Sequence, residues 1–260
     1  MRYAVISDLH ANQASLSVVL RWCQENGIDK IVNLGDIVGW GAQPNECCEM
    51  LRQNQIPGIA GNHDLAALGD FEPVYFKRPA RHRMLWTRAV LREDNKHYLR
   101  SLPETLMMDA AFLMVHGSLK SYSQYMLKDE TVRESFQLFE QRYPSCNLCF
   151  FGHTHRPVAH QLIDGKLTQL TGLEWTLDPA ARYLINPGSI GYARYAEIPL
   201  SFLVYDQERQ TVKLERLLKS NYPNLYQPPA PDVPWNVTVA TQYAIFAKRS
   251  LVNFVRNRIR

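Results

Sequence analysis

The amino-acid sequence predicts an α/β fold, and three observations support this prediction. Short apolar runs alternate with amphipathic segments through the first 60 residues, which gives the order β-α-β-α-β. Polar side chains directly follow several of the predicted strands. The 260 residues are 46% hydrophobic and 21% charged, which is the composition of a chain that buries a core.

The first hundred residues divide into strands and helices by their apolar spacing. Strands are predicted at 2–7, 30–34 and 58–60, and helices at 13–26 and 45–54. The first helix has Leu16, Val19 and Cys23 at helical spacing and ends before Gly27. Residues 70–100 are also predicted to be helical, with eight bases and four acids. We favour a solvated helical face for this basic segment over a wall of a substrate cleft.

The rest of the chain is predicted to be mainly strands. They are expected at 112–116, 148–151, 158–162, 166–171, 183–186, 201–205 and 211–217, with one helix at 129–142. Asp164-Gly165 is typical of a tight hairpin turn. Residues 223–234 contain five prolines and are expected to form an extended linker. This divides the chain into a domain at 1–222, the linker, and a tail at 235–260.

The net charge of +4 is unevenly distributed. Residues 233–260 hold five bases and no acid, so the remainder of the chain is close to neutral at −1. The tail also has an apolar stripe at helical spacing, which predicts a basic amphipathic helix. We rank its roles as docking or homo-oligomer formation first, contact with an anionic membrane surface second, and nucleic-acid binding last.

The sequence favours a cytoplasmic protein. Asp8 interrupts the first apolar run, so no signal peptide is expected, and no run of 18 apolar residues predicts a membrane span. The five cysteines are an odd set that fits reduced thiols. Cys146 and Cys149 have the CxxC spacing but lack a second pair, so we interpret them as strand cysteines.

Side chains that can bind metals follow five predicted strands in turn. They are Asp8 and His10, then Asp36, then Asn62 and His63, then His116, then His153 and His155. Because ligands bind at the carboxyl ends of strands in α/β sheets, these residues are expected to converge. Mixed nitrogen and oxygen donors suit a transition-metal ion, and so many donors imply two ions. The competing interpretation of Asp8 and Asp36 is helix N-capping.

The motifs D-x-H, GD, GNH-[DE], H and GH-x-H occur here in that order, and the sequence resembles the calcineurin-like metallophosphoesterases over about residues 1–205. SDLHAN, GDIVGWGAQPNE, GNHD, GHTHRP and NPGSIG are similar to its compact prokaryotic phosphodiesterase-like branch. The chain departs from the protein Ser/Thr phosphatase branch after Asp36, where Asp-Arg-Gly is missing. The resemblance implies a four-layer α-β-β-α sandwich of two mixed sheets, with a dinuclear metal site at the carboxyl edge of the strands.

The resemblance also implies a role for each motif residue. Asp8, His10 and His155 would hold one metal, Asn62, His116 and His153 the other, and Asp36 would bridge them. His63, with Asp36 and Asn62, would be catalytic, acting as an acid to the leaving group or a donor to the phosphate; the competing interpretation is that His63 only supports its neighbours. In the loop at Asn186–Ser189, Gly188 would allow close approach to the site. Arg194 would clamp the phosphate, unless it pairs with Glu197.

The predicted function is metal-dependent hydrolysis of a phosphodiester, either of a nucleotide or of another small molecule. The implied nucleophile is a hydroxide between two ions, which are expected to be Mn²⁺, with Fe, Zn, Co and Ni as alternatives. Three other functions stay open: a phosphomonoesterase or protein Ser/Thr phosphatase, a non-catalytic scaffold, and a nuclease guided by the tail. Trp40 and Trp86 are interpreted as packing residues, with stacking on a base as the alternative.

Overall fold

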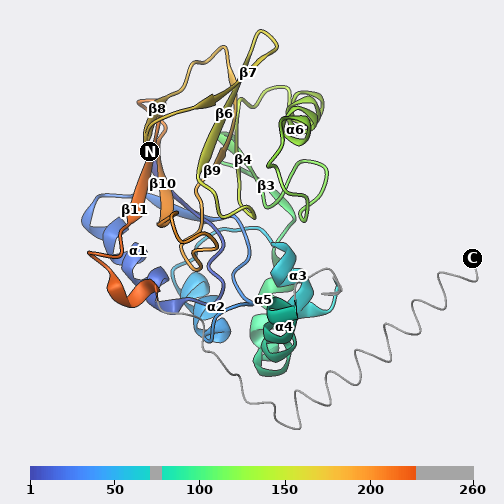
Figure 1. The fold of residues 1–260 in the computed structure, drawn as a ribbon, viewed down its shortest axis with the longest axis vertical. Helices are drawn as coiled ribbons and strands as arrows, with labels where there is room; N and C mark the ends of the chain where they lie inside the picture. The colour runs from blue at the N-terminus through green and yellow to red at the C-terminus, as the bar shows by residue number, and fades with distance from the viewer. Residues whose placement is uncertain (71–77, 227–260) are drawn as a thin grey trace, which may run out of the picture.

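The computed structural model describes residues 1–70 and 78–226. Its helices are α1 (Gln13–Glu25), α2 (Pro44–Gln53), α3 (Asn62–Leu68), α4 (Arg78–Val90), α5 (Glu93–Ser101), α6 (Asp129–Arg142) and the short 3₁₀ helix η2 (Pro223–Tyr226). The strands form two mixed sheets, and the helices lie outside them (Figure 1). The predicted α/β class is confirmed.

The first sheet has the order β2-β1-β10-β11-β8. Its strands are β1 (Arg2–Ile6), β2 (Lys30–Asn33), β8 (Glu174–Thr176), β10 (Leu200–Asp206) and β11 (Thr211–Leu217). β1 and β2 are parallel, with Tyr3 opposite Lys30, because α1 returns the chain to the same end of the sheet. The other pairings in this sheet are antiparallel.

The second sheet has the order β3-β4-β5-β9-β6-β7. Its strands are β3 (Thr105–Met108), β4 (Phe112–Val115), β5 (Leu148–Phe151), β6 (Val158–Ile163), β7 (Lys166–Leu170) and β9 (Arg182–Asn186). β4, β5 and β9 run parallel in its centre. Asp164 and Gly165 both have positive φ, at 48° and 74°, and turn β6 into β7 as the hairpin signal predicted.

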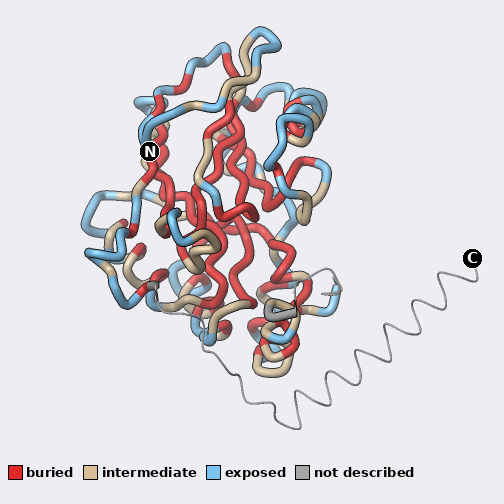
Figure 2. Tube along the Cα trace, in the orientation of Figure 1, coloured by how far each residue is buried: buried red, intermediate tan, exposed pale blue. Residues whose placement is uncertain are grey.

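Alternation of side chains along the strands produces the four layers. Tyr3 and Val5 of β1 pack between the sheets with Phe112 and Met114 of β4. The intervening residues of β1 pack under α1 and α2, and those of β4 pack under α6. Figure 2 shows the resulting buried strands inside a more exposed shell. The expected α-β-β-α sandwich is therefore present.

Two predictions for the first hundred residues were wrong in detail. Residues 58–60 form only one parallel bridge, between Asn33 and Gly58, because the N–H of Ala60 donates instead to the carbonyl of Pro103. Of the predicted helical segment at 70–100, residues 71–77 lie outside the described residues, and the described remainder contains two helices, α4 and α5. Asn45 stabilises the break, since its amide donates to the carbonyl of Val90 and its Oδ1 accepts from the N–H of Arg92. The sequence analysis also missed α3, β3 and β8.

The first four residues of the predicted linker form a 3₁₀ helix. Residues 223–226 form η2, where Leu225 is buried and its carbonyl accepts from the side chain of Asn12 at 3.4 Å. The remainder of the linker and the tail at 235–260 lie outside the described residues. Among the residues that are described, no helix is long and apolar enough to cross a membrane. All five cysteines are buried with free thiols.

Candidate metal centre

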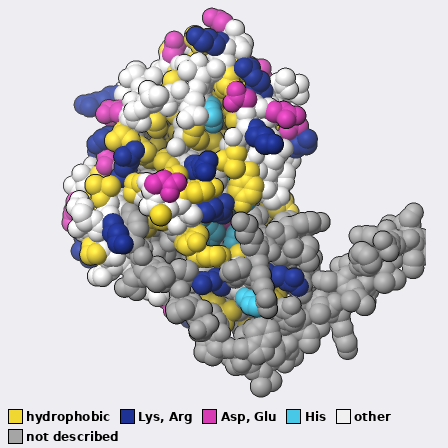
Figure 3. Space-filling model, in the orientation of Figure 1, with side chains coloured by type: hydrophobic (Ala, Val, Ile, Leu, Met, Phe, Trp, Pro, Cys, Tyr) yellow, Lys and Arg dark blue, Asp and Glu magenta, His cyan; other side chains and the backbone are white. Residues whose placement is uncertain are grey.

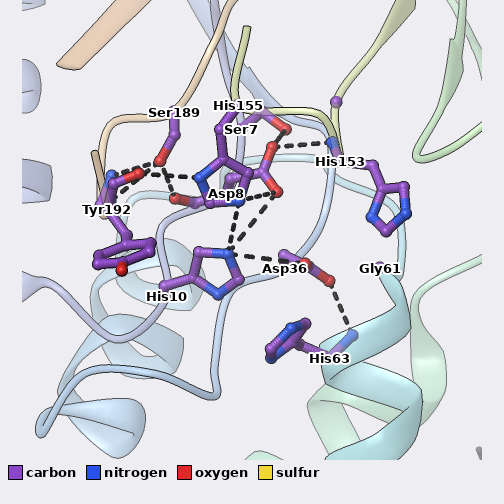
Figure 4. Close-up of polar contacts among 12 residues, drawn as sticks. Ser7, Asp8, His10, Asp36, Gly61, His63, His153, His155, Ser189 and Tyr192 are labelled. Atoms are coloured by element: carbon purple, nitrogen blue, oxygen red, sulfur yellow. Dashed lines mark hydrogen bonds and ion pairs between the residues drawn. The ribbon is translucent and has the colours of Figure 1, made fainter. Parts of the chain in front are cut away.

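The polar residues of the five motifs meet at one edge of the two sheets. β1 and β2 run parallel in one sheet, and β4, β5 and β9 run parallel in the other, so the loops that follow them share an edge. Figure 4 shows side chains from these loops pointing toward one another. The predicted convergence is therefore present, and the candidate ligands form groups of close donor atoms.

The first cluster consists of Asp8, His10 and His155, all buried. Nε2 of His155 lies 3.2 Å from Oδ1 of Asp8 and 3.0 Å from Nε2 of His10 (Figure 4). The two imidazole rings stack with their centroids 4.9 Å apart. Three donor atoms of mixed nitrogen and oxygen type thus face one small volume.

The second cluster consists of Asp36, His116 and His153, with Asn62 beside it. Nε2 of His116 lies 3.3 Å from Oδ1 of Asp36 and 3.3 Å from Oδ1 of Asn62. The other oxygen of Asp36 lies 3.8 Å from Nε2 of His10, in the first cluster. Asp36 therefore presents one oxygen to each cluster.

Main-chain carbonyls fix the rotation of three of the histidine rings. Nδ1 of His116 bonds to the carbonyl of Leu34 at 2.7 Å, and Nδ1 of His155 bonds to that of Tyr192 at 2.8 Å. Nε2 of His153 bonds to the carbonyl of Ser123 at 3.1 Å. A carbonyl accepts only from a protonated nitrogen, so in the neutral form of each ring the opposite nitrogen is the electron-pair donor.

The carboxylate of Asp8 is held by one oxygen and exposes the other to the cluster. Oδ2 accepts from Ser7 Oγ at 2.7 Å and from the N–H of His153 at 3.0 Å. Oδ1 is buried and has no hydrogen-bond partner among the residues that the structure describes. A Cβ at Gly152 would overlap Ser7 Oγ and lie 3.0 Å from Oδ2, so only glycine leaves room for this arrangement.

The backbone of the candidate ligands is held in an uncommon conformation. Positive φ values between 47° and 66° occur at Asp8, His10, Asp36, His153 and His155. Residues with a Cβ rarely adopt this left-handed region, and such strain gathers at functional sites. Neither Asp8 nor Asp36 caps a helix, because Asn12 and Gln43 occupy the N-cap positions of α1 and α2. The capping interpretation is therefore wrong.

Asp64 connects the loop after β2 to the start of α3. Its Oδ1 accepts from the N–H groups of Ile37 and Val38 at 2.9 and 3.1 Å, and its Oδ2 accepts from the N–H of Gly61 at 3.0 Å. The N–H of His63 donates to Asp36 Oδ1 at 2.8 Å. This bracing fixes the backbone that carries Asp36, Asn62 and His63.

The ring of His63 lies beside the first cluster. It meets the ring of His10 edge to face, with centroids 4.7 Å apart, and His10, Asp36 and His63 form a third group of close donor atoms. A Cβ at Gly39 would lie 2.5 Å from Nδ1 of His63. The glycine at position 39 therefore makes room for the histidine ring.

Burial and mutual charge shift the pKa values in this centre. Burial alone would lower the pKa of His116, but the adjacent Asp36 charge outweighs it and raises the pKa to about 9. Burial lowers the pKa of His153 to about 3 and that of His10 well below its usual value. Burial and the Asp36 charge raise the pKa of Asp64 to about 7, although its N–H donors oppose this. Densely packed titratable groups of this kind are typical of metal and catalytic sites.

Arg194 lies beside His155 of the first cluster. Its Nη1 donates to the hydroxyl of Tyr125 at 3.0 Å, and its Nη2 lies 3.4 Å from Nε2 of His155. Gly188 is buried, and its N–H donates to Oδ1 of Asn186 at 2.8 Å. Because that N–H is already used, we do not propose a direct contact between Gly188 and substrate.

An aromatic pair borders the first cluster. Trp40 and Tyr192 have ring centroids 4.5 Å apart, and the guanidinium of Arg83 on α4 lies 4.6 Å from the Trp40 ring. Arg83 also donates to the carbonyl of Trp40 at 2.9 Å, and Arg88 donates to that of Ala66 at 2.6 Å. Two of the bases in the segment 70–100 therefore brace the main chain near the site.

Sequence analysis missed four residues that shape the centre: Ser7, Asp64 as a brace, Ser123 and Tyr125. Ser7 and Asp64 stand inside recognised motifs, so their positions could have indicated a supporting role. Ser123 acts through its carbonyl and Tyr125 through its ring, and both belong to a loop without a motif.

Figure 3 shows histidine at the surface in the middle of one face, next to cationic and hydrophobic side chains.

Comparison with known proteins identifies similar chains. Residues 1–210 match the family model of the calcineurin-like phosphoesterase superfamily domain. An uncharacterised protein of Methanocaldococcus jannaschii is 32% identical over 222 residues, which cover 82% of this chain and 86% of that protein.

Two solved structures resemble the fold. A metallophosphoesterase from Sphaerobacter thermophilus has a TM-score of 0.68 and 32% identity, covering 84% of this chain and 89% of its own. A hypothetical protein from Pyrococcus horikoshii OT3 has a TM-score of 0.65 and 19% identity, covering 88% of this chain and 99% of its own. The second likeness concerns the fold alone.

Proposed function

The chain belongs to the calcineurin-like phosphoesterase superfamily, whose enzymes use divalent metal ions, and we propose that it hydrolyses a phosphodiester of a nucleotide or another small molecule. The observation that carries this proposal is the position of Asp36. Its two oxygens face two separate groups of buried histidines, at 3.3 Å from His116 and 3.8 Å from His10. A carboxylate shared in this way suits a pair of metal ions.

The residues present fit two divalent transition-metal ions. Asp8, His10 and His155 would hold the first ion, and Asn62, His116 and His153 the second, with Asp36 between them. Two atoms support this fit. Asp8 Oδ1 and His153 Nδ1 are buried without a hydrogen-bond partner among the described residues, and a bound cation would give each of them a partner. Nitrogen and oxygen donors together favour Mn²⁺ or a similar ion. Such ions, when bound, would supply Lewis acidity and an activated water.

Arg194 and His63 are the residues proposed to act on the substrate. The guanidinium of Arg194 lies 3.4 Å from Nε2 of His155, so an anion bound at the first cluster would be within its reach. His63, next to His10, would donate a hydrogen bond to the phosphate or a proton to the leaving oxygen. Water would form the new bond to phosphorus, and the leaving alcohol would depart with a proton.

One difference in sequence supports a small diester over a phosphoprotein. In the protein-phosphatase pattern the GD motif continues to an Asp-Arg-Gly, but here Asp36 is followed by Ile37-Val38-Gly39-Trp40-Gly41. The chain therefore lacks the acid of that pattern next to His63. A phosphomonoesterase is the second candidate, because the two clusters themselves do not distinguish a monoester from a diester.

The experiment compares two chromogenic substrates on purified protein loaded with Mn²⁺. We expect release of nitrophenol from bis(4-nitrophenyl) phosphate, dependent on the metal and faster than from 4-nitrophenyl phosphate. Faster cleavage of the monoester would favour the second candidate. Cleavage of neither, with two ions bound per chain by elemental analysis, would refute an enzymatic role for the site and favour a scaffold.

A further inference from the structure

The loop between β4 and α6, residues 117–128, covers the second cluster. It is tightly bonded to itself: Ser118 Oγ donates to Oε1 of Gln124 at 2.5 Å, and the N–H groups of Ser118 and Gln124 both donate to the carbonyl of Ser121. The carbonyl of Ser123 then bonds to Nε2 of His153. The loop is thus a defined wall of the metal centre.

Tyr125 lies at the surface of this wall. Its ring stacks on the ring of His153, with centroids 3.9 Å apart and planes 20° apart. His153 is only 4% exposed, whereas Tyr125 is 42% exposed. One face of the tyrosine ring therefore covers a candidate metal ligand, while much of the side chain remains accessible to solvent.

Arg194 connects Tyr125 to the first cluster. Its Nη1 donates to the tyrosine hydroxyl at 3.0 Å, and its guanidinium carbon lies 5.5 Å from the centre of the tyrosine ring. The other end of the guanidinium reaches His155. A phosphoryl group held at the two clusters and by Arg194 would consequently have the Tyr125 ring beside it.

We propose that Tyr125 forms a binding subsite for a planar aromatic group attached to the phosphoester, such as a nucleobase or an aryl group. This inference rests on the proposed function, since it places the phosphoryl group at the two clusters. Exposed aromatic rings bind planar groups by stacking, at little cost in conformational entropy. A tyrosine that served only to pack against His153 would gain more by burying its outer surface as well.

The test uses two ligands with a carbon–phosphorus bond, which the enzyme is not expected to cleave. Phenylphosphonate and methylphosphonate carry the same headgroup and differ in the aromatic ring. Calorimetry on the full chain loaded with Mn²⁺ should show that phenylphosphonate binds about five- to tenfold more tightly. Tyr125→Leu should bring this ratio close to one, and Tyr125→Phe should retain most of it. Tyr143→Leu is the matched control, because Tyr143 packs on Phe139 at the end of α6, and its ratio should equal that of the wild type.

Two results would overturn the inference. One is a wild-type protein that binds phenylphosphonate and methylphosphonate with equal affinity, a result that does not depend on whether any variant folds. The other is an unchanged ratio in folded Tyr125→Leu, or an equal weakening of both ligands, which would make Tyr125 a positioning residue for His153. Failure of the proposed function looks different: both phosphonates would bind with the expected ratio while neither nitrophenyl ester was cleaved.

Discussion

The main-chain N–H of His153 donates to Oδ2 of Asp8 at 3.0 Å, across 145 residues of sequence. Asp8 follows β1 in the first sheet, and His153 follows β5 in the second. The bond therefore joins the two sheets at the metal centre, and it also links one cluster to the other. Because each cluster contains residues from both sheets, the donor atoms come together only when the sandwich has formed.

Asp36→Asn should remove the negative charge shared by the two clusters. We expect activity to fall at least about 100-fold and bound metal to fall below two ions per chain, because an amide is a poor bridge between cations. Elemental analysis and steady-state kinetics check this. Asp109→Asn is the control, since Asp109 pairs with Lys30 away from the motifs, at 2.6 Å. Full activity and two bound ions in Asp36→Asn would contradict the shared role of Asp36.

Ser7→Ala tests whether the support of Asp8 matters. The substitution removes the hydroxyl that donates to Oδ2 at 2.7 Å and leaves the bond from the His153 N–H in place. Metal affinity should fall about tenfold, and the free energy of unfolding by about 1 kcal/mol. Competition with a chelator and thermal unfolding measure the two effects. Ser17→Ala, which removes a helix hydroxyl bonded to the Gln13 carbonyl, should leave metal affinity unchanged.

Asp64→Asn should loosen the loops that carry Asp36 and Asn62. An asparagine side chain has one acceptor oxygen, so it cannot accept from the N–H groups on both sides as the carboxylate does. We expect a loss of about 1–3 kcal/mol in the free energy of unfolding and weaker metal binding. Urea denaturation with and without Mn²⁺ gives both values. If Asp64→Asn unfolded at the same urea concentration as the wild type, the bracing role would be refuted.

Metal affinity should depend on pH through His116. The pKa of this side chain is raised to about 9, and only the unprotonated ring binds a metal. Below pH 9, protonation of His116 should therefore weaken Mn²⁺ binding about tenfold for each unit by which the pH falls. Above pH 9, His116 should no longer make the Mn²⁺ affinity depend on pH. Chelator competition between pH 7 and 10 measures the slope.

In the metal-free protein, the raised pKa of His116 makes the folded state less stable as the pH rises, whereas the same rise in pH strengthens metal binding. A pKa raised on folding means that the folded state binds the proton more tightly than the unfolded state. The stabilisation from His116 is therefore complete below about pH 6.5 and is lost as the pH rises through about 9. Thermal unfolding of the metal-free protein should report this loss between pH 7 and 9, and His116→Gln should reduce it. An unchanged pH dependence in that variant would assign the loss to other groups.

The order of the motifs was enough to predict the architecture. Two parallel strands and the following acids, at Asp8 and Asp36, place both carboxylates at one sheet edge, because crossover helices return the chain to the same end. Helix α6 was predicted with its observed bounds, since Val132, Phe136 and Phe139 repeat at helical spacing. The break between α4 and α5 was missed because the groups that stabilise it belong to Asn45, on another helix.

The amino-acid sequence is enough to predict which side chains lie at this edge and which chemistry their donor atoms allow. How these side chains are turned and what surrounds them depends on the folded arrangement. The carbonyls of Leu34, Tyr192 and Ser123 choose the nitrogen that each histidine presents, and a carbonyl is common to every residue type. Tyr125 reaches His153 through a folded loop rather than through a motif. Such contacts depend on the packing of distant segments, so residue spacing carries no signal for them.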